Sequence, residues 1–347
     1  MGGSASKKTV CVTRIGAIGD MIITTPVYPL LKADGYKVIA NTSIRGWEIL
    51  KHNPYIDEFL EHDTSIPPDE QLTKHWENIK KGYDKFINLS GSIEGSLSKV
   101  SDRDDFYQDK EVLHKECNVN FYDRTLELAG YGHIKGQNGQ LFFSPLEETL
   151  ARGYRRKYKK KFLIMWVLSG SSPHKTWPWV EYTAKMFMSQ HPDVVIMTVG
   201  EELCKLLEWS HPQTKCYSGL WGVRKTLIMT KYVDLVVGTD TGIMHGAGCF
   251  STPKILLHSA NTKENLSKYW LNCTDLSAGM KCQPCHRMHS TREFCNLDSK
   301  LLTPACMSKL KPDKVYVEMS RIYNIWKEKR RNKDGVYRIY GQPNFLH

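Results

Sequence analysis

Three short segments of the 347-residue chain combine glycines with charged side chains in patterns that can support chemistry. The first is Gly16-Ala-Ile-Gly19-Asp20, which follows an apolar run. A carboxylate at such a turn can act as a general base and accept the proton of an incoming hydroxyl. Asp20 can equally cap the helix that follows, which is a frequent role of Asp. Spacing alone favours the cap, because two glycines three residues apart are a weak signal.

The second segment places small residues and one lysine before an expected helix. These residues are Ser169, Gly170, Ser171 and Lys175. Backbone N–H groups at a helix N-terminus, together with a lysine, form a typical diphosphate site. An ordinary loop rich in Ser and Pro is the alternative.

The third segment, 238–245, joins an apolar strand to a helix. Asp240 at this turn is placed to bind ribose hydroxyls, while the amides of Thr241 and Gly242 can reach a phosphate at the helix start. His245 falls one turn into the helix and faces the same cleft. The alternative is a capping turn with a histidine whose ring is satisfied locally.

Short, continuously apolar stretches alternate with helical patterns in both halves of the chain. The expected strands are 9–15, 37–40, 85–89, 162–168, 194–199, 233–237 and 254–257. The expected helices are one ending at 31 and those at 71–81, 120–128, 179–190, 201–208, 220–230 and 241–249. This alternation predicts an α/β fold with parallel sheets that helices cover on both faces.

Two such units predict two facing Rossmann-like domains. We expect an N-terminal domain over 1–155, a C-terminal domain over 156–312, and a final segment 313–347. The helix of that segment, about 313–329, is expected to pack back on the first domain and to lead into a basic tail. Ligands bind beyond the carboxyl ends of parallel strands, where all three glycine-containing segments fall. The sequence therefore predicts one cleft between the domains.

The formal net charge of +11 is concentrated in two stretches. Residues 151–161 hold seven basic side chains and no acid, and residues 327–333 hold five and one acid, so the two stretches account for the whole surplus. Concentrated positive charge favours a polyanionic partner, and two solvated, flexible segments are the alternative. The predicted polyanion-binding residues are Arg152, Arg155, Arg156, Lys157, Lys159, Lys160, Lys161, Lys329, Arg330 and Arg331.

The composition excludes several classes of protein. Apolar residues make up 41% of the chain and charged residues 24%, which rules out disorder over the whole length. No apolar run approaches the ~18 residues of a membrane span, and the first ten residues lack the apolar core of a secretion signal. We expect a soluble, cytoplasmic protein, a monomer or weak oligomer, with at most peripheral contact with the inner membrane.

Four of the ten cysteines are clustered within 282–306, in a Cys-rich segment, 273–306, of the second domain. They are Cys282, Cys285, Cys295 and Cys306. Their spacing fits a tetrahedral structural zinc site, with His286 and His289 as alternative ligands. Free thiols or a disulfide are the alternatives, and a reducing compartment disfavours the disulfide. The spacing shows no open coordination position, so we expect no catalytic role.

Together, these motifs resemble those of the bacterial heptosyltransferases, glycosyltransferase family 9. The matching residues are Gly16, Gly19, Asp20, Lys175, Trp177, Pro178, Gly200, Glu202, Leu203, the segment 238–245, Pro253, Leu257 and His258. The resemblance extends from about residue 9 to 320, is strongest in the second half, and includes the cysteine-containing tail. It implies a GT-B fold whose N-terminal domain holds the acceptor and whose C-terminal domain holds a nucleotide-sugar. It also implies transfer with inversion and without a catalytic metal.

The resemblance further implies roles for individual residues. Asp20 matches the proposed general base, Lys175 the phosphate-binding lysine and, approximately, Glu202 a ribose or base contact. The nucleotide-diphosphate loop is matched by Asp240, Thr241, Gly242 and His245. The remaining predicted donor-binding residues are Gly16, Gly19, Ser169, Gly170, Ser171, Gly200 and Met244. Segment 91–118 has no recognisable counterpart, so the resemblance does not identify the acceptor.

Three functions remain open at this point. The first is an enzyme that glycosylates a lipopolysaccharide-type acceptor, with the basic stretches contacting lipid phosphates. The second is a virus-encoded enzyme of the host cytoplasm that modifies hydroxymethylated bases in DNA, bound through its phosphates with a steep salt dependence. The third is a nucleotide-sugar-binding module without turnover, against which Asp20 and Lys175 argue. The family's usual substrates favour the first.

Overall fold

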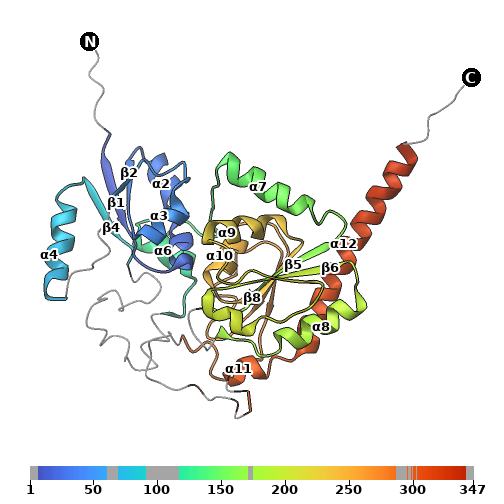
Figure 1. Cartoon of the computed structure of the whole chain (residues 1–347). Coiled ribbons are helices and arrows are strands. Elements are labelled where there is room, and N and C mark those ends of the chain that lie inside the picture. Colours follow the sequence, from blue (N-terminus) through green and yellow to red (C-terminus); the bar gives the residue numbers. More distant parts are fainter. Residues whose placement is uncertain are drawn as a thin grey trace, which may run out of the picture.

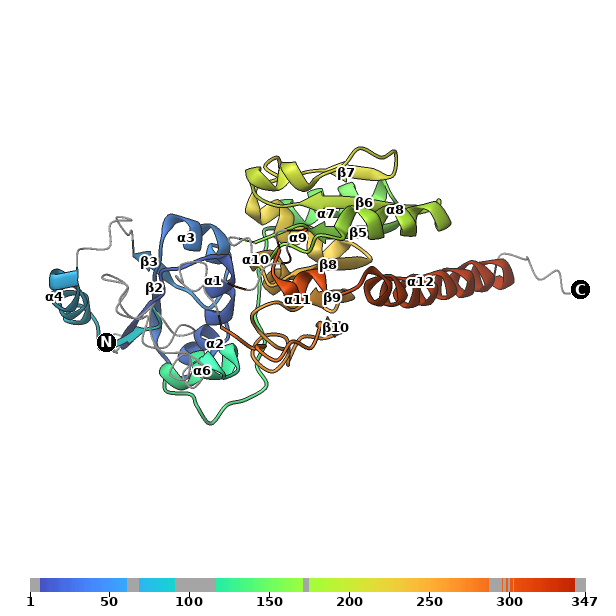
Figure 2. The same ribbon diagram turned by 90° about the horizontal axis from the view of Figure 1, so that it is seen from below.

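The computed structural model describes residues 7–60, 69–90, 117–170, 175–286, 295, 298, 300–301 and 303–340. Over these residues the chain forms two lobes that stand side by side, each with its own parallel sheet and helices (Figure 1, Figure 2). The predicted α/β fold with two parallel-sheet domains is therefore confirmed. No helix in this part of the chain is long and apolar enough to cross a bilayer.

The first lobe contains a sheet with the strand order β3-β2-β1-β4, in which all neighbours run parallel. Its strands are β1 (Thr9–Thr13), β2 (Lys37–Asn41), β3 (Glu58–Leu60) and β4 (Lys85–Asn88). Its helices are α1 (Ile18–Thr24), α2 (Val27–Ala33), α3 (Ile44–Leu50), α4 (Asp69–Lys80) and α6 (Phe121–Leu128). Val10 and Val12 of the central strand β1 are buried against Ile22 and Leu31 from α1 and α2.

Local chemistry explains where α1 begins and ends. Asp20 accepts a hydrogen bond from the Ala17 N–H at 2.7 Å, which satisfies a donor at the N-terminus of the helix. The apolar run that ends at Leu31 was expected to form one helix. It forms two, because Pro26 has no N–H to continue the hydrogen-bond ladder and α2 starts at the next residue. Strand β1 ends at Thr13 and α1 begins at Ile18, so the turn between them lies at the carboxyl end of β1.

The second lobe contains a sheet with the strand order β10-β9-β8-β5-β6-β7, again parallel throughout. Its strands are β5 (Phe162–Val167), β6 (Val194–Val199), β7 (Thr214–Cys216), β8 (Leu235–Thr239), β9 (Lys254–Leu257) and β10 (Cys273–Leu276). Its helices are α7 (Pro145–Arg156), α8 (Val180–Gln190), the 3-10 helix η4 (Glu202–Leu207), α9 (Val223–Tyr232), α10 (Gly242–Gly248), α11 (Ala305–Ser308) and α12 (Pro312–Tyr340). The edge strands β7 and β10 were not expected, because they are short and partly polar.

Strand β5 shows why this sheet is buried on both faces. Side chains alternate between the faces of a strand. Phe162, Ile164 and Trp166 pack in a core cluster with α8 and α12. Leu163 and Met165 pack in the opposite cluster with α9 and α10. A strand covered on both sides requires the continuous apolar sequence found here.

Two expectations about the domain limits need correction. Helix α7 lies over the second lobe, packs against α9 and places Ala151 in the core of that lobe (Figure 1). The boundary therefore falls before residue 145 rather than at 155. Helix α12 packs against α8, β9 and β10 instead of packing back on the first domain. The reason is its apolar stripe, because Val315, Met319 and Tyr323 are buried in the core of the second lobe.

Candidate active site

A cavity of about 360 Å³ lies between the two lobes, at the carboxyl ends of β1, β5 and β8. The first lobe contributes the turn into α1 and the start of α3. The second lobe contributes the loop after β5, the turn into α10 and the segment before α9. Ligands of parallel sheets bind at this edge, so the cavity lies where the sequence predicted a cleft.

The lobes touch directly beside the cavity, through the first turns of α1 and α10. Glycines make this approach possible. A Cβ on Gly242 would lie 2.7 Å from Cγ2 of Ile18, and a Cβ on Gly19 would lie 2.9 Å from the His245 ring. Neither position accepts a side chain unless the neighbouring atoms move. The two turns that carry the predicted catalytic and donor-binding residues are thereby fixed against each other.

Asp20 lies on the first-lobe wall with both carboxylate oxygens engaged. Oδ2 accepts the Ala17 N–H, and Oδ1 lies 3.0 Å from Nη2 of Arg14. Arg14 is buried and also donates to the Leu89 carbonyl, so it fixes the orientation of the carboxylate. The capping role and the position on the cavity wall therefore coexist in Asp20. A carboxylate in this position can receive a proton from a hydroxyl in the cavity.

The opposite wall is organised around Asp240, which is 7% exposed. Its Oδ2 lies 3.3 Å from Nζ of Lys175 and accepts a hydrogen bond from Asn261, while Oδ1 lies 3.4 Å from Nε2 of His245. Burial by itself would raise the pKa of Asp240, but the charges of Lys175 and His245 outweigh it and hold this pKa well below its usual range. The ionised carboxylate keeps the Lys175 ammonium at the cavity, where it can meet a phosphate.

Two hydroxyl groups hold this wall together. Thr241 caps α10, since its Oγ1 accepts the Met244 N–H at 3.3 Å. Thr239 Oγ1 donates to the carbonyl of Lys175 at 2.7 Å. The second hydrogen bond ties the loop after β5 to the end of β8. The lysine and the first turn of α10 are therefore positioned as one unit.

Most of the predicted site residues line the cavity. They are Gly19, Ser169, Gly170, Gly200, Asp240, Thr241, Gly242 and His245, together with Asp20 and Lys175. Ser171 lies outside the residues that the structure describes. The turns from two lobes, far apart in the sequence, are thus brought to one site.

Three predicted donor-binding residues lie off the cavity wall. Met244 is fully buried in the core of the second lobe, because α10 directs this position toward the sheet. The side chain of Glu202 is 71% exposed and forms its ion pair within η4, whereas the adjacent Glu201 lines the cavity. Gly16 lies behind Asp20, where a Cβ would crowd the carboxylate. The role of Gly16 is therefore to leave room for Asp20.

Sequence reasoning missed several residues of the cavity wall, among them Arg45, Trp221 and Asn261. Arg45 enters from α3, Trp221 from the segment before α9, and Asn261 from the loop after β9. Trp221 stacks on Tyr217 with 4.2 Å between the ring centroids and 18° between the ring planes. Arg45 and Asn261 each follow a strand by four residues, and this position at a carboxyl end was the available signal. No pattern in the sequence distinguishes Trp221.

The predicted polyanion-binding residues fall into two groups. Arg155 pairs with Asp234 at 2.8 Å, and Lys161 donates to the Pro192 carbonyl at 3.0 Å, so both serve the internal structure of the second lobe. The other group comprises Arg152, Arg156, Lys157, Lys159, Lys160, Lys329, Arg330 and Arg331, which are exposed except for the half-buried Arg330.

The four clustered cysteines lie near one another. Burial and then the neighbouring Cys295, Cys285 and Cys282 raise the pKa of the Cys306 thiol to about 12. In the part of the chain that the structure describes, however, no group of three or more potential ligands is arranged to hold a metal ion. The structural zinc site stays a prediction.

Comparison with known proteins points to one group. No family model matches the chain. The lipopolysaccharide heptosyltransferase 1 of Campylobacter coli is 20% identical over 294 residues, which cover 72% of this chain and 84% of that protein.

Two solved structures show the same fold over nearly the whole chain. A glycosyl transferase family 9 protein from Veillonella parvula matches with a TM-score of 0.67 and 14% identity, covering 91% of this chain and 97% of that one. The E. coli ADP-heptose lipopolysaccharide heptosyltransferase II matches with a TM-score of 0.64 and 14% identity, covering 92% and 99%. The resemblance predicted from the motifs is confirmed, and the fold is the GT-B fold of these transferases.

Proposed function

We propose that the protein is an inverting glycosyltransferase that moves a sugar from a nucleotide-diphosphate sugar to a hydroxyl of a polyanionic acceptor. One observation carries the proposal: Asp20 of the first lobe lines the same cavity as Lys175 and Asp240 of the second. Displacement at a sugar carbon needs a base on one side and a stabilised leaving group on the other. The similarity to glycosyltransferases in sequence and fold supports the same reaction class.

The proposed reaction is a single displacement at the anomeric carbon. The acceptor oxygen forms a bond to this carbon while the bond from the carbon to the diphosphate oxygen breaks on the opposite face, which inverts the configuration. Asp20 takes the proton of the acceptor hydroxyl, and the electron pair of the broken bond leaves with the diphosphate. General-base assistance of this kind typically contributes ~10²–10⁴ in rate.

Lys175 is the proposed counterpart of Asp20 on the donor side. Its ammonium is already oriented by Asp240 and can stabilise the charge that develops on the departing diphosphate. We propose that this positive charge makes a divalent metal unnecessary for catalysis. Glu201, which lines the cavity, replaces Glu202 as the candidate contact to the ribose or base.

ADP-heptose is the first donor to test, and a lipopolysaccharide core is the first acceptor. Both choices follow from the names of the similar proteins, one of which is an ADP-heptose lipopolysaccharide heptosyltransferase. The exposed cations of residues 151–161 and 327–331 support DNA with hydroxymethylated bases as the second acceptor, because they suit any polyanion.

A product assay tests the proposal. Purified protein is incubated with ADP-heptose and a panel of other nucleotide-sugars, with lipopolysaccharide core and hydroxymethylated DNA offered in parallel. We expect transfer to one of the two acceptors, unchanged by a chelator, and NMR should show the anomeric configuration opposite to that of the donor. Retained configuration, or no transfer from any donor, would contradict the proposal.

A further inference from the structure

We propose that one face of the second lobe docks on an anionic phospholipid membrane. This face, the α7/α12 basic face, comprises the outer side of α7, the turn that follows it and the neighbouring part of α12. Its principal residues are Leu146, Leu150, Arg156, Lys157, Lys159 and Lys160, with residues 329–331 of α12. The inference concerns the surface of the second lobe and does not depend on the proposed glycosyl transfer.

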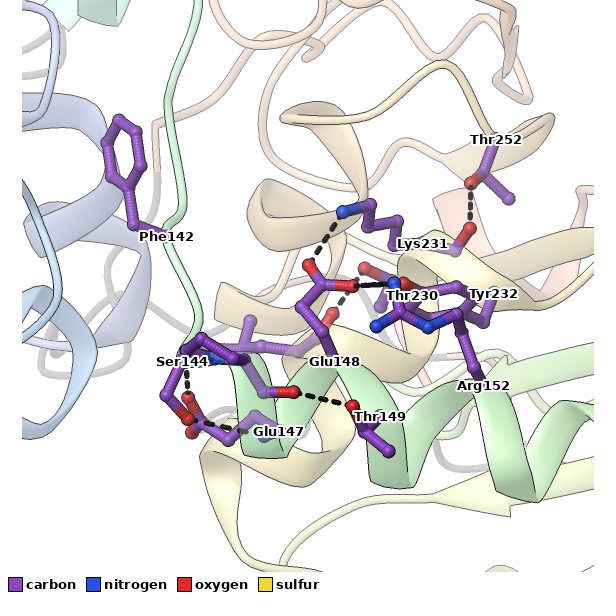
Figure 3. A network of polar contacts seen from close by, with 12 residues as sticks. Phe142, Ser144, Glu147, Glu148, Thr149, Arg152, Thr230, Lys231, Tyr232 and Thr252 are labelled. Carbon is purple, nitrogen blue, oxygen red and sulfur yellow. Dashed lines mark hydrogen bonds and ion pairs between the residues drawn. The ribbon is translucent and has the colours of Figure 1, made fainter.

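The acids of α7 are paired with cations, and Figure 3 shows Glu148 beside Lys231 and Arg152. Glu148 lies 2.7 Å from Nζ of Lys231 and accepts a hydrogen bond from Tyr232. Glu147 forms an ion pair with the buried Arg224. Both carboxylates are therefore used to attach α7 to α9. Arg152 pairs with Glu148, but Arg156, Lys157, Lys159 and Lys160 form no ion pair with another described residue, so the end of the helix and the turn after it keep a positive charge.

Two leucines give the same face an apolar component. Leu146 and Leu150 lie one helical turn apart and are 67% and 64% exposed. A cavity of about 590 Å³ opens beside them between α7 and α9. Its lining includes Leu150, Ala151, Tyr154, Lys157, Ile228 and Met229. Exposed apolar side chains beside Lys and Arg side chains are typical of segments that lie in a membrane interface, and here Arg156 ends α7 while Lys157, Lys159 and Lys160 follow it.

The fold joins the two basic stretches into one surface, although they are far apart in the sequence. Nη1 of Arg330 donates to the carbonyl of Lys159 at 3.3 Å, across a separation of 171 positions. One turn earlier in α12, the ring of Trp326 packs edge-on against Phe162, which directly follows the basic turn. Figure 1 shows the end of α7 beside α12 accordingly. The cations of both stretches therefore reach the same partner.

The position of this face favours a membrane over nucleic acid. Strand β5 starts at Phe162, beside the basic turn, and ends at Val167, which lines the cavity. At about 3.3 Å per residue the face and the cavity lie roughly 17 Å apart along the strand. Cations at this distance cannot by themselves place a base of a duplex in the cavity, whereas a membrane contact needs only to hold the protein at the surface and leaves the cavity open. Burial of the exposed leucines in the headgroup region also contributes favourable binding free energy, whereas contact with a phosphate backbone would contribute none through these side chains.

Vesicle sedimentation tests the inference with the full chain. The protein is mixed with vesicles of phosphatidylcholine alone or with added phosphatidylglycerol, at low and high salt. We expect binding only to the anionic vesicles, and weaker binding at high salt. K157E/K159E/K160E should weaken partitioning by about a hundredfold or more, because the loss of three cations near an anionic surface accounts for about a hundredfold and the three new carboxylates add repulsion. L146S/L150S should weaken it by about tenfold or more.

The matched control is K309E/K311E/K314E, which changes the charge equally near α11, away from α7 (Figure 1). All replaced side chains are exposed, so circular dichroism and nucleotide binding should stay at wild-type values. The inference is overturned if the wild type does not distinguish the vesicles or if the control loses as much binding. It is also overturned if L146S/L150S binds normally while duplex DNA displaces the protein from the vesicles.

Discussion

Gly242→Ala is the most specific perturbation of the contact between the lobes. The added Cβ would lie 2.7 Å from Cγ2 of Ile18, nearer still to its Cβ, and 3.1 Å from the backbone nitrogen of Gly19. Ordinary contacts of a Cβ begin at 3.4 Å. The Cβ and backbone atoms cannot rotate away, so α1 and α10 must separate by about 1 Å, a displacement that can cost ~10² in rate when reacting groups are misplaced.

This separation moves Asp20 away from the donor side of the cavity. We expect kcat for transfer to fall about a hundredfold, since productive geometry tolerates little displacement. Binding of a nucleoside diphosphate, measured by calorimetry, should change less than turnover, because Gly242→Ala keeps the backbone amide of this position and the side chains of Lys175 and Asp240 stay together in the second lobe. Gly153→Ala is the control, as nothing lies within 4 Å of its added Cβ, and it should keep wild-type turnover. Wild-type turnover in folded Gly242→Ala would refute the claim that the α1–α10 contact sets the active geometry.

Lys175→Met should weaken binding of a nucleoside diphosphate about tenfold or more in calorimetry, while Lys185→Met on the exposed side of α8 should not. The pKa of Glu147 is lowered from 4.5 to about 2. The hydrogen bond from Arg224 is the largest cause; burial opposes it, and further hydrogen bonds add to it. This depressed pKa gives a stabilisation that is present above pH 4.5 and is lost as the pH falls toward 2, so Glu147→Gln should remove that step from acid-unfolding curves. Arg224→Ala also releases α9 from the carbonyls of Glu48 and Ile49, and should lower unfolding free energy by about 3 kcal/mol in denaturant titrations. Protein purified under reducing conditions should contain zinc, and Cys306→Ser should lower the zinc content. An elemental analysis that finds neither zinc nor iron in the wild type would dismiss the metal prediction.

The elements predicted best from the sequence are those whose apolar pattern fits a single type of buried structure. Segment 162–168 is apolar throughout and segment 194–199 is apolar except for Thr198, which favours central strands covered on both faces. Once these strands are placed, the positions of the turns at their carboxyl ends follow. The cavity and most of its residues could therefore be predicted from the pattern alone.

Packing partners and side-chain directions could not be predicted in the same way. The apolar stripe of α12 shows that one face is buried but not which lobe buries it. The choice between Glu201 and Glu202 depends on the 3-10 turn η4, which the sequence does not specify. Helix α7 was not among the expected helices and its end was described only as part of a basic stretch, although Ser144 and Glu147 form a capping box that marks its start.

The central claim is that Asp20 acts on an acceptor while the second lobe holds the donor. Its most direct test is to measure nucleoside diphosphate binding and transfer in the same preparations of Asp20→Asn. The control is Asp57→Asn, which removes a carboxylate paired with Lys32 elsewhere in the first lobe. We expect Asp20→Asn to bind like the wild type with turnover reduced ~10²–10⁴-fold, and the control to be active. Wild-type turnover in Asp20→Asn would contradict the claim.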